Sequence, residues 1–215
     1  SSGLPAYIEY FKIEEIKTKQ DIINNISSLD LEYKPDSKMV YSDLGMILLM
    51  HISEKVTGRK FEELVRAWVL NPLDMNNSFF NPSKDLFYKI APTEEDYIFR
   101  DTLIHGVVHD ENAFIMGGVS GHAGLFSNAY DIANYGQMML NFGLYNGSRI
   151  FSARSISNFT KRQNMPISSD FALGWDTPSR KGKSTAGDLF SENSYGHLGF
   201  TGTSFWIDSD QKIII

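Results

Sequence analysis

Residues 195–207 read YGHLGFTGTSFWI, and this stretch decides the fold class. Its aromatic and β-branched residues predict a strand over Gly199–Asp208, followed by a turn at Ser209-Asp210-Gln211 and a second strand over Lys212–Ile215. The earlier part of the chain carries helical patterns instead. Helices first and an antiparallel pair of strands last indicate an α+β fold.

The same stretch contains glycines that a strand would not choose for stability. Glycine weakens a strand unless backbone has to come close to another group. Gly196 and Gly199 flank His197, and we interpret them as positions that clear side chains so that a ligand backbone can lie along the strand. The alternative is that His197 is an ordinary histidine at a strand edge.

Five helices are predicted from capping residues and apolar spacing. They cover about Thr18–Ser27, Asp43–Val56 with Gly58 behind it, Phe61–Leu70 stopped by Asn71-Pro72, Asn128–Gly143, and Ser152–Lys161. Residues 74–112 lack a clear period, and a long irregular segment inside a compact domain is usually functional. We expect one incomplete catalytic domain, with a helical region and long active-site loops over 1–165 and antiparallel strands over 166–215.

Composition excludes several classes of function. The chain has 215 residues, a net charge of −6 and a pI near 5.3, so clustered Lys and Arg for nucleic-acid binding are not expected. Its longest apolar run, around Met46–Met50, is too short to span a bilayer. The sequence contains no Cys, which excludes a thiolate nucleophile, disulfides and Cys-ligated metal.

Tyr41-Ser42-Asp43 places a phenol, a hydroxyl and a carboxylate at the start of an apolar helix. Taken alone, the three residues are most simply an N-cap with a tyrosine packed beside it. A catalytic interpretation of Tyr41 and Asp43 needs support from other segments, because three-residue motifs often match by chance.

Two further patterns are weaker than they look. His105 and His109 lie four residues apart, but Gly106 and the two valines between them disfavour the helix on which such zinc pairs usually lie. We expect hydrogen-bonding roles for Asp110 and Asn112 instead. The single Ser-x-x-Lys, Ser209 to Lys212, falls on the predicted hairpin turn, where the two side chains would diverge.

Several stretches, taken in order, resemble the serine β-lactamase and penicillin-binding-protein-like superfamily, especially the branch of class C β-lactamases, esterases and D,D-peptidases. The stretches are Ser2-Gly-Leu-Pro5, Tyr41-Ser-Asp43 (like the family's Tyr-x-Asn), Asn71-Pro-Leu-Asp-Met75, Gly121-His-Ala-Gly-Leu-Phe-Ser127, and Gly196-His-Leu-Gly-Phe-Thr-Gly-Thr203 (like its Lys-Thr-Gly strand). Val108–Asn112 and Gly121–Gly124 are also similar to domains fused behind family 3 glycoside hydrolases.

The resemblance implies acyl transfer by a serine nucleophile on a peptidoglycan-type peptide, an ester or a β-lactam, with no cofactor and no metal. Tyr41 would transfer the proton, aided by a pKa that nearby positive charge lowers. His197 would replace the motif lysine, and the backbone N–H of Phe200 would bind the oxyanion. Asp43, Gly199, Phe200 and Thr201 would contact substrate. A location in the periplasm or cell envelope is implied as well.

The departures from the family pattern shape the expectation. The family's Ser-x-x-Lys lies upstream of its "SGLP" segment, and this chain starts at Ser1. We therefore expect the 215 residues to be inert alone and to follow a preceding domain. Asp43 in place of Asn weakens a claim of antibiotic hydrolysis. The alternative is a catalytically dead module that binds cell-wall peptide.

Overall fold

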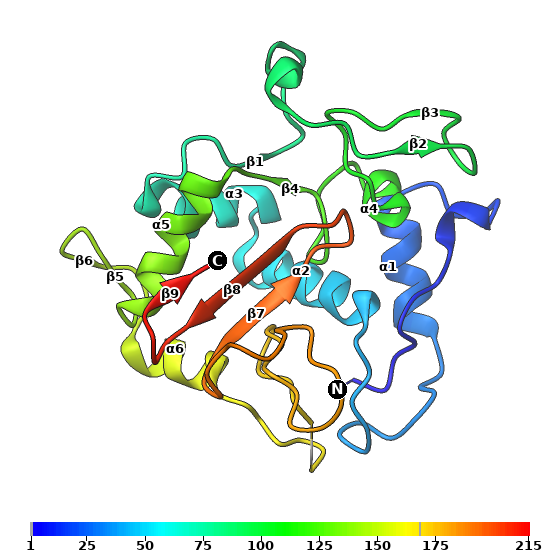
Figure 1. Cartoon of the computed structure of the whole chain (residues 1–215). Helices are drawn as coiled ribbons and strands as arrows, with labels where there is room; N and C mark the ends of the chain where they lie inside the picture. Colours follow the sequence, from blue (N-terminus) through cyan, green and yellow to red (C-terminus); the bar gives the residue numbers. More distant parts are fainter. Residues whose placement is uncertain (1, 168) are drawn as a thin grey trace. The chain divides into compact units, whose positions relative to one another are not determined.

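The computed structural model describes residues 2–167 and 169–215 (Figure 1). These residues form two compact units. The first unit comprises Ser1–Ala67 and Asn77–Ser127, and the second comprises Trp68–Asn76 and Asn128–Ile215. The chain is a mixture of helices and short antiparallel strands, so the predicted α+β class is confirmed. The division expected between residues 165 and 166 stays a prediction.

The first unit is mainly helical. Its helices are α1 (Lys19–Ser28), α2 (Asp43–Thr57), α3 (Phe61–Val65) and α4 (Glu111–Ile115), with 3₁₀ turns at Tyr10–Lys12 and Lys84–Lys89. Its strands form two antiparallel pairs, β1 (Phe79–Phe80) with β4 (Leu125–Phe126) and β2 (Glu95–Asp96) with β3 (Thr102–Leu103). Most of the segment 74–112, predicted to be irregular, is loop, and only short elements interrupt it.

The two long helices of the first unit begin where their capping residues predict. Thr18 and Asp21 form a reciprocal capping box at α1, with Thr18 N–H donating to Asp21 Oδ2 at 2.9 Å. Ser42 Oγ accepts from the Gly45 N–H at the start of α2, and Gly58 ends that helix in the left-handed conformation at φ 66°. Both helices are therefore specified by local sequence.

The core of the first unit joins the apolar faces of α1 and α2 to the segment that precedes them. Its buried members are Leu4, Tyr10, Ile16, Ile22, Ile23, Ile26, Leu44, Ile47, Met50 and Met116. Within the part of the chain that the structure describes, no helix is long and apolar enough to cross a membrane.

The helix predicted over Phe61–Leu70 is shorter and less regular than expected. The α-helical part ends at Val65, and a π-helical turn continues over Arg66–Leu70. Asn71–Pro72 does not stop the chain's helical path, because Asn71–Leu73 forms a 3₁₀ turn with proline in its first positions, where no N–H is needed.

The second unit combines two helices with the C-terminal sheet. α5 (Ala129–Leu140) and α6 (Ala153–Thr160) start at Asn128 and Ser152, as predicted, and a small hairpin joins β5 (Leu144–Tyr145) to β6 (Ser148–Arg149). β7 (Tyr195–Leu198), β8 (Ser204–Asp208) and β9 (Ile213–Ile214) form an antiparallel sheet in the order β7-β8-β9 (Figure 1).

The predicted strand Gly199–Asp208 is wrong at its start. Residues 199–203 form the turn between β7 and β8, and only Ser204–Asp208 is a strand. The Gly199 N–H donates to Thr203 O at 2.7 Å, and Gly202 has a φ of +91°, which favours glycine. Close packing requires glycine at position 196, because a Cβ there would lie 2.3 Å from the indole of Trp206.

A buried carboxylate ties the loop before β7 to the turn after β8. Asp208 is 1% exposed and accepts hydrogen bonds from the backbone N–H groups of Ser191, Asp210 and Gln211 at 2.8–3.0 Å. Burial alone would raise the pKa of Asp208, but these donors outweigh it and lower the pKa to about 2.

We predict that Asp208→Asn removes part of the acid sensitivity of unfolding. The Asp208 carboxylate adds stability above the ordinary aspartate pKa of about 3.9 and loses it as pH falls towards about 2. The variant should be less stable at pH 7 and should show a smaller fall in unfolding free energy between about pH 4 and 2. Urea unfolding at several pH values measures both, with the exposed Asp188→Asn as control; parallel pH curves for Asp208→Asn and the wild type would contradict the assignment.

Within the first unit, a glycine lets the loop at residues 120–124 lie directly on α2. A Cβ on Gly121 would stand 2.2 Å from the carbonyl oxygen of Met46 and 3.1 Å from the Cβ of Met50. This close approach of two backbones needs the absence of a side chain. It fixes where His122, the next residue, is placed.

We predict that Gly121→Ala destabilises the first unit by about 1–3 kcal/mol, because the loop must move away from α2. Gly45→Ala is the matched control. Gly45 lies on α2, the helix that Gly121 contacts, and a Cβ at Gly45 would have no neighbour closer than 3.8 Å. That change should be neutral or stabilise by about 0.5–1 kcal/mol through helix propensity. Urea denaturation gives both values; equal effects would refute the close contact.

Candidate active site

In the first unit, Tyr41-Ser42-Asp43 is anchored to the segment before α1. Ser42 Oγ donates to the Pro5 carbonyl at 2.6 Å, and the Asp43 N–H donates to the Ala6 carbonyl at 3.0 Å. Ser42 therefore caps α2 and also binds a segment far away in the sequence. The simple capping interpretation of Ser42 is confirmed, and the neighbouring Tyr41 and Asp43 gain a fixed backbone.

The segment 94–112 brings a second carboxylate to the same place. Arg100 is almost fully buried, pairs with Asp96 at 2.7 Å, and donates to the carbonyl oxygens of Val108 and His109 at 2.8 and 2.5 Å. Asp110 follows and caps α4 by accepting from the Ala113 N–H at 2.7 Å. Asn112 donates to the Ile8 carbonyl at 2.9 Å, so the expected hydrogen-bonding roles of Asp110 and Asn112 are confirmed.

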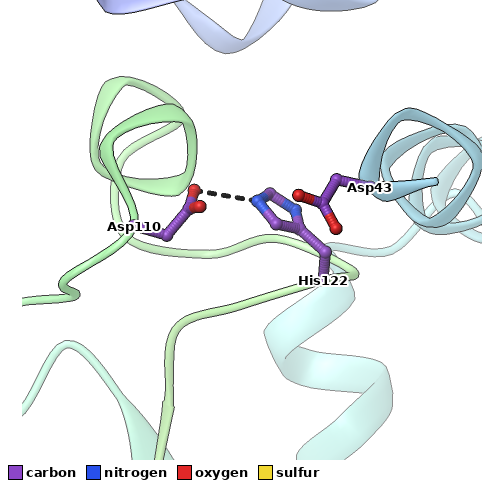
Figure 2. A group of neighbouring side chains, drawn as sticks. All are labelled: Asp43, Asp110 and His122. Atoms are coloured by element: carbon purple, nitrogen blue, oxygen red, sulfur yellow. Dashed lines mark hydrogen bonds and ion pairs between the residues drawn. The ribbon is translucent and has the colours of Figure 1, made fainter. Parts of the chain in front are cut away.

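His122 completes the group. Its Nε2 lies 2.8 Å from Asp110 Oδ1, and its Nδ1 lies 2.8 Å from Ser120 Oγ. Figure 2 shows the imidazole of His122 between the carboxylates of Asp110 and Asp43. The three side chains come from three different segments of the chain. One ligand-type atom of each of Asp43, Asp110 and His122 lies within 4.8 Å of the others.

The sequence did not predict the grouping of His122 and Asp110 with Asp43. Each lies in a stretch that matched the family pattern, but the three positions are far apart in the chain. The short Gly121-His122-Ala123-Gly124 passage was the available signal, since glycines on both sides of a histidine indicate close backbone approach.

Acidic groups dominate the electrostatics around Tyr41, which is 49% exposed. Burial of its hydroxyl raises the pKa of Tyr41, and the negative charges of Asp43 and Asp110 raise it further. The pKa of Tyr7 is raised as well, by burial and then by the charges of Glu111, Asp110, Glu9 and Asp43. The residues around Tyr41 therefore favour the neutral phenol at pH 7, whereas the family resemblance implied a lowered pKa.

The histidine pair considered for zinc is occupied by other contacts. His105 Nε2 lies 2.9 and 2.8 Å from the carbonyl oxygens of Phe87 and Ile90, and His109 Nε2 lies 2.6 Å from Glu94 Oε1. Gly106 between them has a φ of +69°, which agrees with a loop rather than a helix. Ser209 and Lys212 lie in the turn between β8 and β9, also as expected.

The second unit carries the other predicted residues. His197 lies on β7 opposite Phe205 of β8, and its Nδ1 is 2.7 Å from the Leu198 carbonyl. Gly199, Phe200 and Thr201 lie in the turn rather than on a strand, and Phe200 is 88% exposed. Tyr41 and Asp43 belong to the first unit. Their roles in substrate contact stay predictions.

We predict that Asp43→Asn lowers the pKa of Tyr41, because it removes one of the two charges that raise it. NMR titration of ¹³C-labelled tyrosine, with the Tyr41 signal assigned by Tyr41→Phe, measures the shift. Glu111→Gln is the control, since Glu111 raises the pKa of Tyr7 but not that of Tyr41. An unchanged or higher pKa for Tyr41 in Asp43→Asn would disprove the electrostatic picture.

Comparison with known proteins places the whole chain in one group. The family model described as Beta-lactamase matches residues 1–215. A protein of Salmonella agona (strain SL483) named "Putative D-alanyl-D-alanine carboxypeptidase" is 38% identical over 206 residues, which is 89% of this chain and 47% of that protein. The chain therefore spans about half the length of the curated relatives it matches.

Solved structures support the same fold. A penicillin-binding protein from Bacillus halodurans is 16% identical with a TM-score of 0.69, and the match covers 99% of this chain and 63% of that one. The octameric penicillin-binding protein homologue from Pyrococcus abyssi is 23% identical with a TM-score of 0.65, covering 100% and 48%. At these identities the likeness establishes the fold alone.

Proposed function

Because this chain belongs to the beta-lactamase family, we propose that it forms part of a serine hydrolase that works through an acyl-enzyme. Its substrate would be a peptidoglycan-type peptide, an ester or a β-lactam, and its site of action the periplasm or cell envelope. The observation that carries the proposal is the anchored Tyr41-Ser42-Asp43 segment, which holds the proposed proton-transfer residue at the start of α2 through Pro5 and Ala6.

The proposed chemistry assigns a role to each unit. In the first unit, Tyr41 takes the proton of a serine hydroxyl as that oxygen attacks the carbonyl, and returns it to the leaving group. In the second unit, His197 occupies the position of the family's lysine and the Phe200 N–H stabilises the oxyanion. Gly199 and Thr201 would contact the substrate beside them.

The raised pKa of Tyr41 sets a condition on this mechanism. A neutral phenol next to Asp43 and Asp110 is a poor base, so the step needs a positive charge close to its oxygen. We propose that the family's Ser-x-x-Lys lysine supplies it, from sequence beyond these 215 residues. The Ser209–Lys212 pair is unsuited to the task because it lies in a hairpin turn instead of a helix.

It follows that residues 1–215 alone should be inert. The relative length of the Salmonella protein leaves room for a preceding domain, and the fusion to a family 3 glycoside hydrolase stays a prediction. The choice among lactamase, esterase and D,D-peptidase depends on contacts around Asp43, whose charge disfavours the amide carbonyl that the family's Asn would bind.

We predict that the protein, expressed with whatever sequence precedes residue 1 in its gene, labels on one serine with a fluorophosphonate or fluorescent penicillin. Tyr41→Phe should lower kcat for ester hydrolysis by about 10²–10⁴-fold, the usual value of a positioned proton-transfer group. Tyr88→Phe, on an exposed tyrosine of the same unit, should match the wild type.

Two results would contradict parts of this proposal. A labelled serine with normal turnover in Tyr41→Phe would refute the role of Tyr41 while keeping the hydrolase. A protein that binds cell-wall peptide but labels on no serine would refute the hydrolase and identify a binding module.

A further inference from the structure

We propose that Asp43, Asp110 and His122 form a binding site for one divalent metal ion of the Zn²⁺ or Mn²⁺ class. Asp43 lies in the first turn of α2, and Asp110 is the N-cap of α4. His122 lies in the loop that packs against α2 through Gly121. Figure 2 shows their polar atoms converging on one another, and these atoms lie within 4.8 Å. Contacts with Pro5 and Ala6 hold the start of α2, and the close approach of Gly121 to Met46 holds the loop at residues 120–124, whereas Asp110 caps α4 with its own side chain.

The histidine at the centre of the cluster is buried. The side chain of His122 is 3% exposed and that of Asp110 is 19% exposed. Two carboxylates that face one imidazole in such a place repel each other unless positive charge lies between them, and either a protonated imidazole or a metal ion can supply that charge. The cluster is therefore suited to a cation, and the imidazole nitrogen points to a metal rather than to a purely oxygen-bound ion.

Nδ1 of His122 contacts Ser120, and Nε2 faces the cluster. Its hydroxyl donates to Met116 Sδ at 3.6 Å, so its oxygen can accept from the Nδ1–H of His122, 2.8 Å away. With its proton on Nδ1, the neutral imidazole would present the Nε2 lone pair to Asp110 Oδ1 at 2.8 Å, whereas a protonated Nε2 would donate to that oxygen. Either a proton or a metal ion can bridge these two atoms, and a metal-bound histidine typically donates its other N–H to an outer partner, as Nδ1 would to Ser120.

The donor set and spacing fit the proposed ions. One imidazole nitrogen and two carboxylate oxygens suit Zn²⁺ or Mn²⁺, whereas Ca²⁺ and Mg²⁺ prefer oxygen ligands only. Ligand atoms at about 2.1 Å from a tetrahedral ion lie about 3.4 Å apart, so Nε2 and Oδ1, now 2.8 Å apart, need to separate by about 0.6 Å. Three protein ligands leave one position for water or for a ligand.

The test is a titration of the chelator-stripped protein with Zn²⁺, Mn²⁺, Ca²⁺ and Mg²⁺, followed by calorimetry and, for Mn²⁺, by electron paramagnetic resonance. We expect one Zn²⁺ or Mn²⁺ per chain. His122→Gln, Asp43→Asn and Asp110→Asn should each weaken binding at least tenfold; the last keeps a residue that caps helices well. His51→Gln, on the same helix as Asp43, should bind as the wild type does.

Direct observation of the imidazole gives a second readout. In ¹⁵N spectra, saturation with Zn²⁺ should shift Nε2 of His122 and leave Nδ1 protonated. The proposal is overturned if the folded wild type binds no Zn²⁺ or Mn²⁺, if the three variants bind as tightly as His51→Gln, or if Nε2 keeps its proton at saturation. None of these measurements uses catalysis, so the result stands apart from the fate of the proposed hydrolase.

Discussion

Two hydrogen bonds hold the first turn of α2 to the chain's opening segment, and the arrangement of the first unit's polar residues depends on them. The Ser42 hydroxyl and the Asp43 N–H donate to consecutive carbonyl groups, those of Pro5 and Ala6. A helix N-terminus normally leaves its N–H groups to a cap or to water. Here the cap residue is itself bound from outside, so the direction of Tyr41 and Asp43 is set by tertiary structure as well as by the helix.

Negative charge near Tyr41 is the chemical consequence of that arrangement. A helix N-terminus favours anions, and Asp43 and Asp110 both occupy such positions, on α2 and α4. The helices thus accommodate the carboxylates at low cost, while the tyrosine beside them becomes harder to ionise. The same preference offsets part of the repulsion between the two carboxylates that lie beside the His122 imidazole.

Local capping signals made four helix starts predictable, whereas the end of α3, the helix α4 and the polar cluster were not predicted from local sequence. Four helices begin directly after the capping residue that predicted them. The caps are Thr18, Ser42, Asn128 and Ser152. The start of β8 was misplaced because the turn at 199–203 depends on the left-handed Gly202 and on a bond across the turn to Thr203. The cluster of Asp43, Asp110 and His122 was missed because it joins three segments that are far apart in the sequence, one of which packs Gly121 closely against Met46.

The hydrogen bonds of Arg100 affect the entropy cost of binding a ligand near α4. By pairing with Asp96 and donating to two successive carbonyl groups, it holds the residues just before α4 in one conformation. Fixing a residue's backbone costs about 1–2 kcal/mol of conformational entropy, and here that cost is met when the protein folds. A ligand that binds beside Asp110 therefore contacts backbone that is already ordered, and its affinity is not reduced by the cost of ordering a loop.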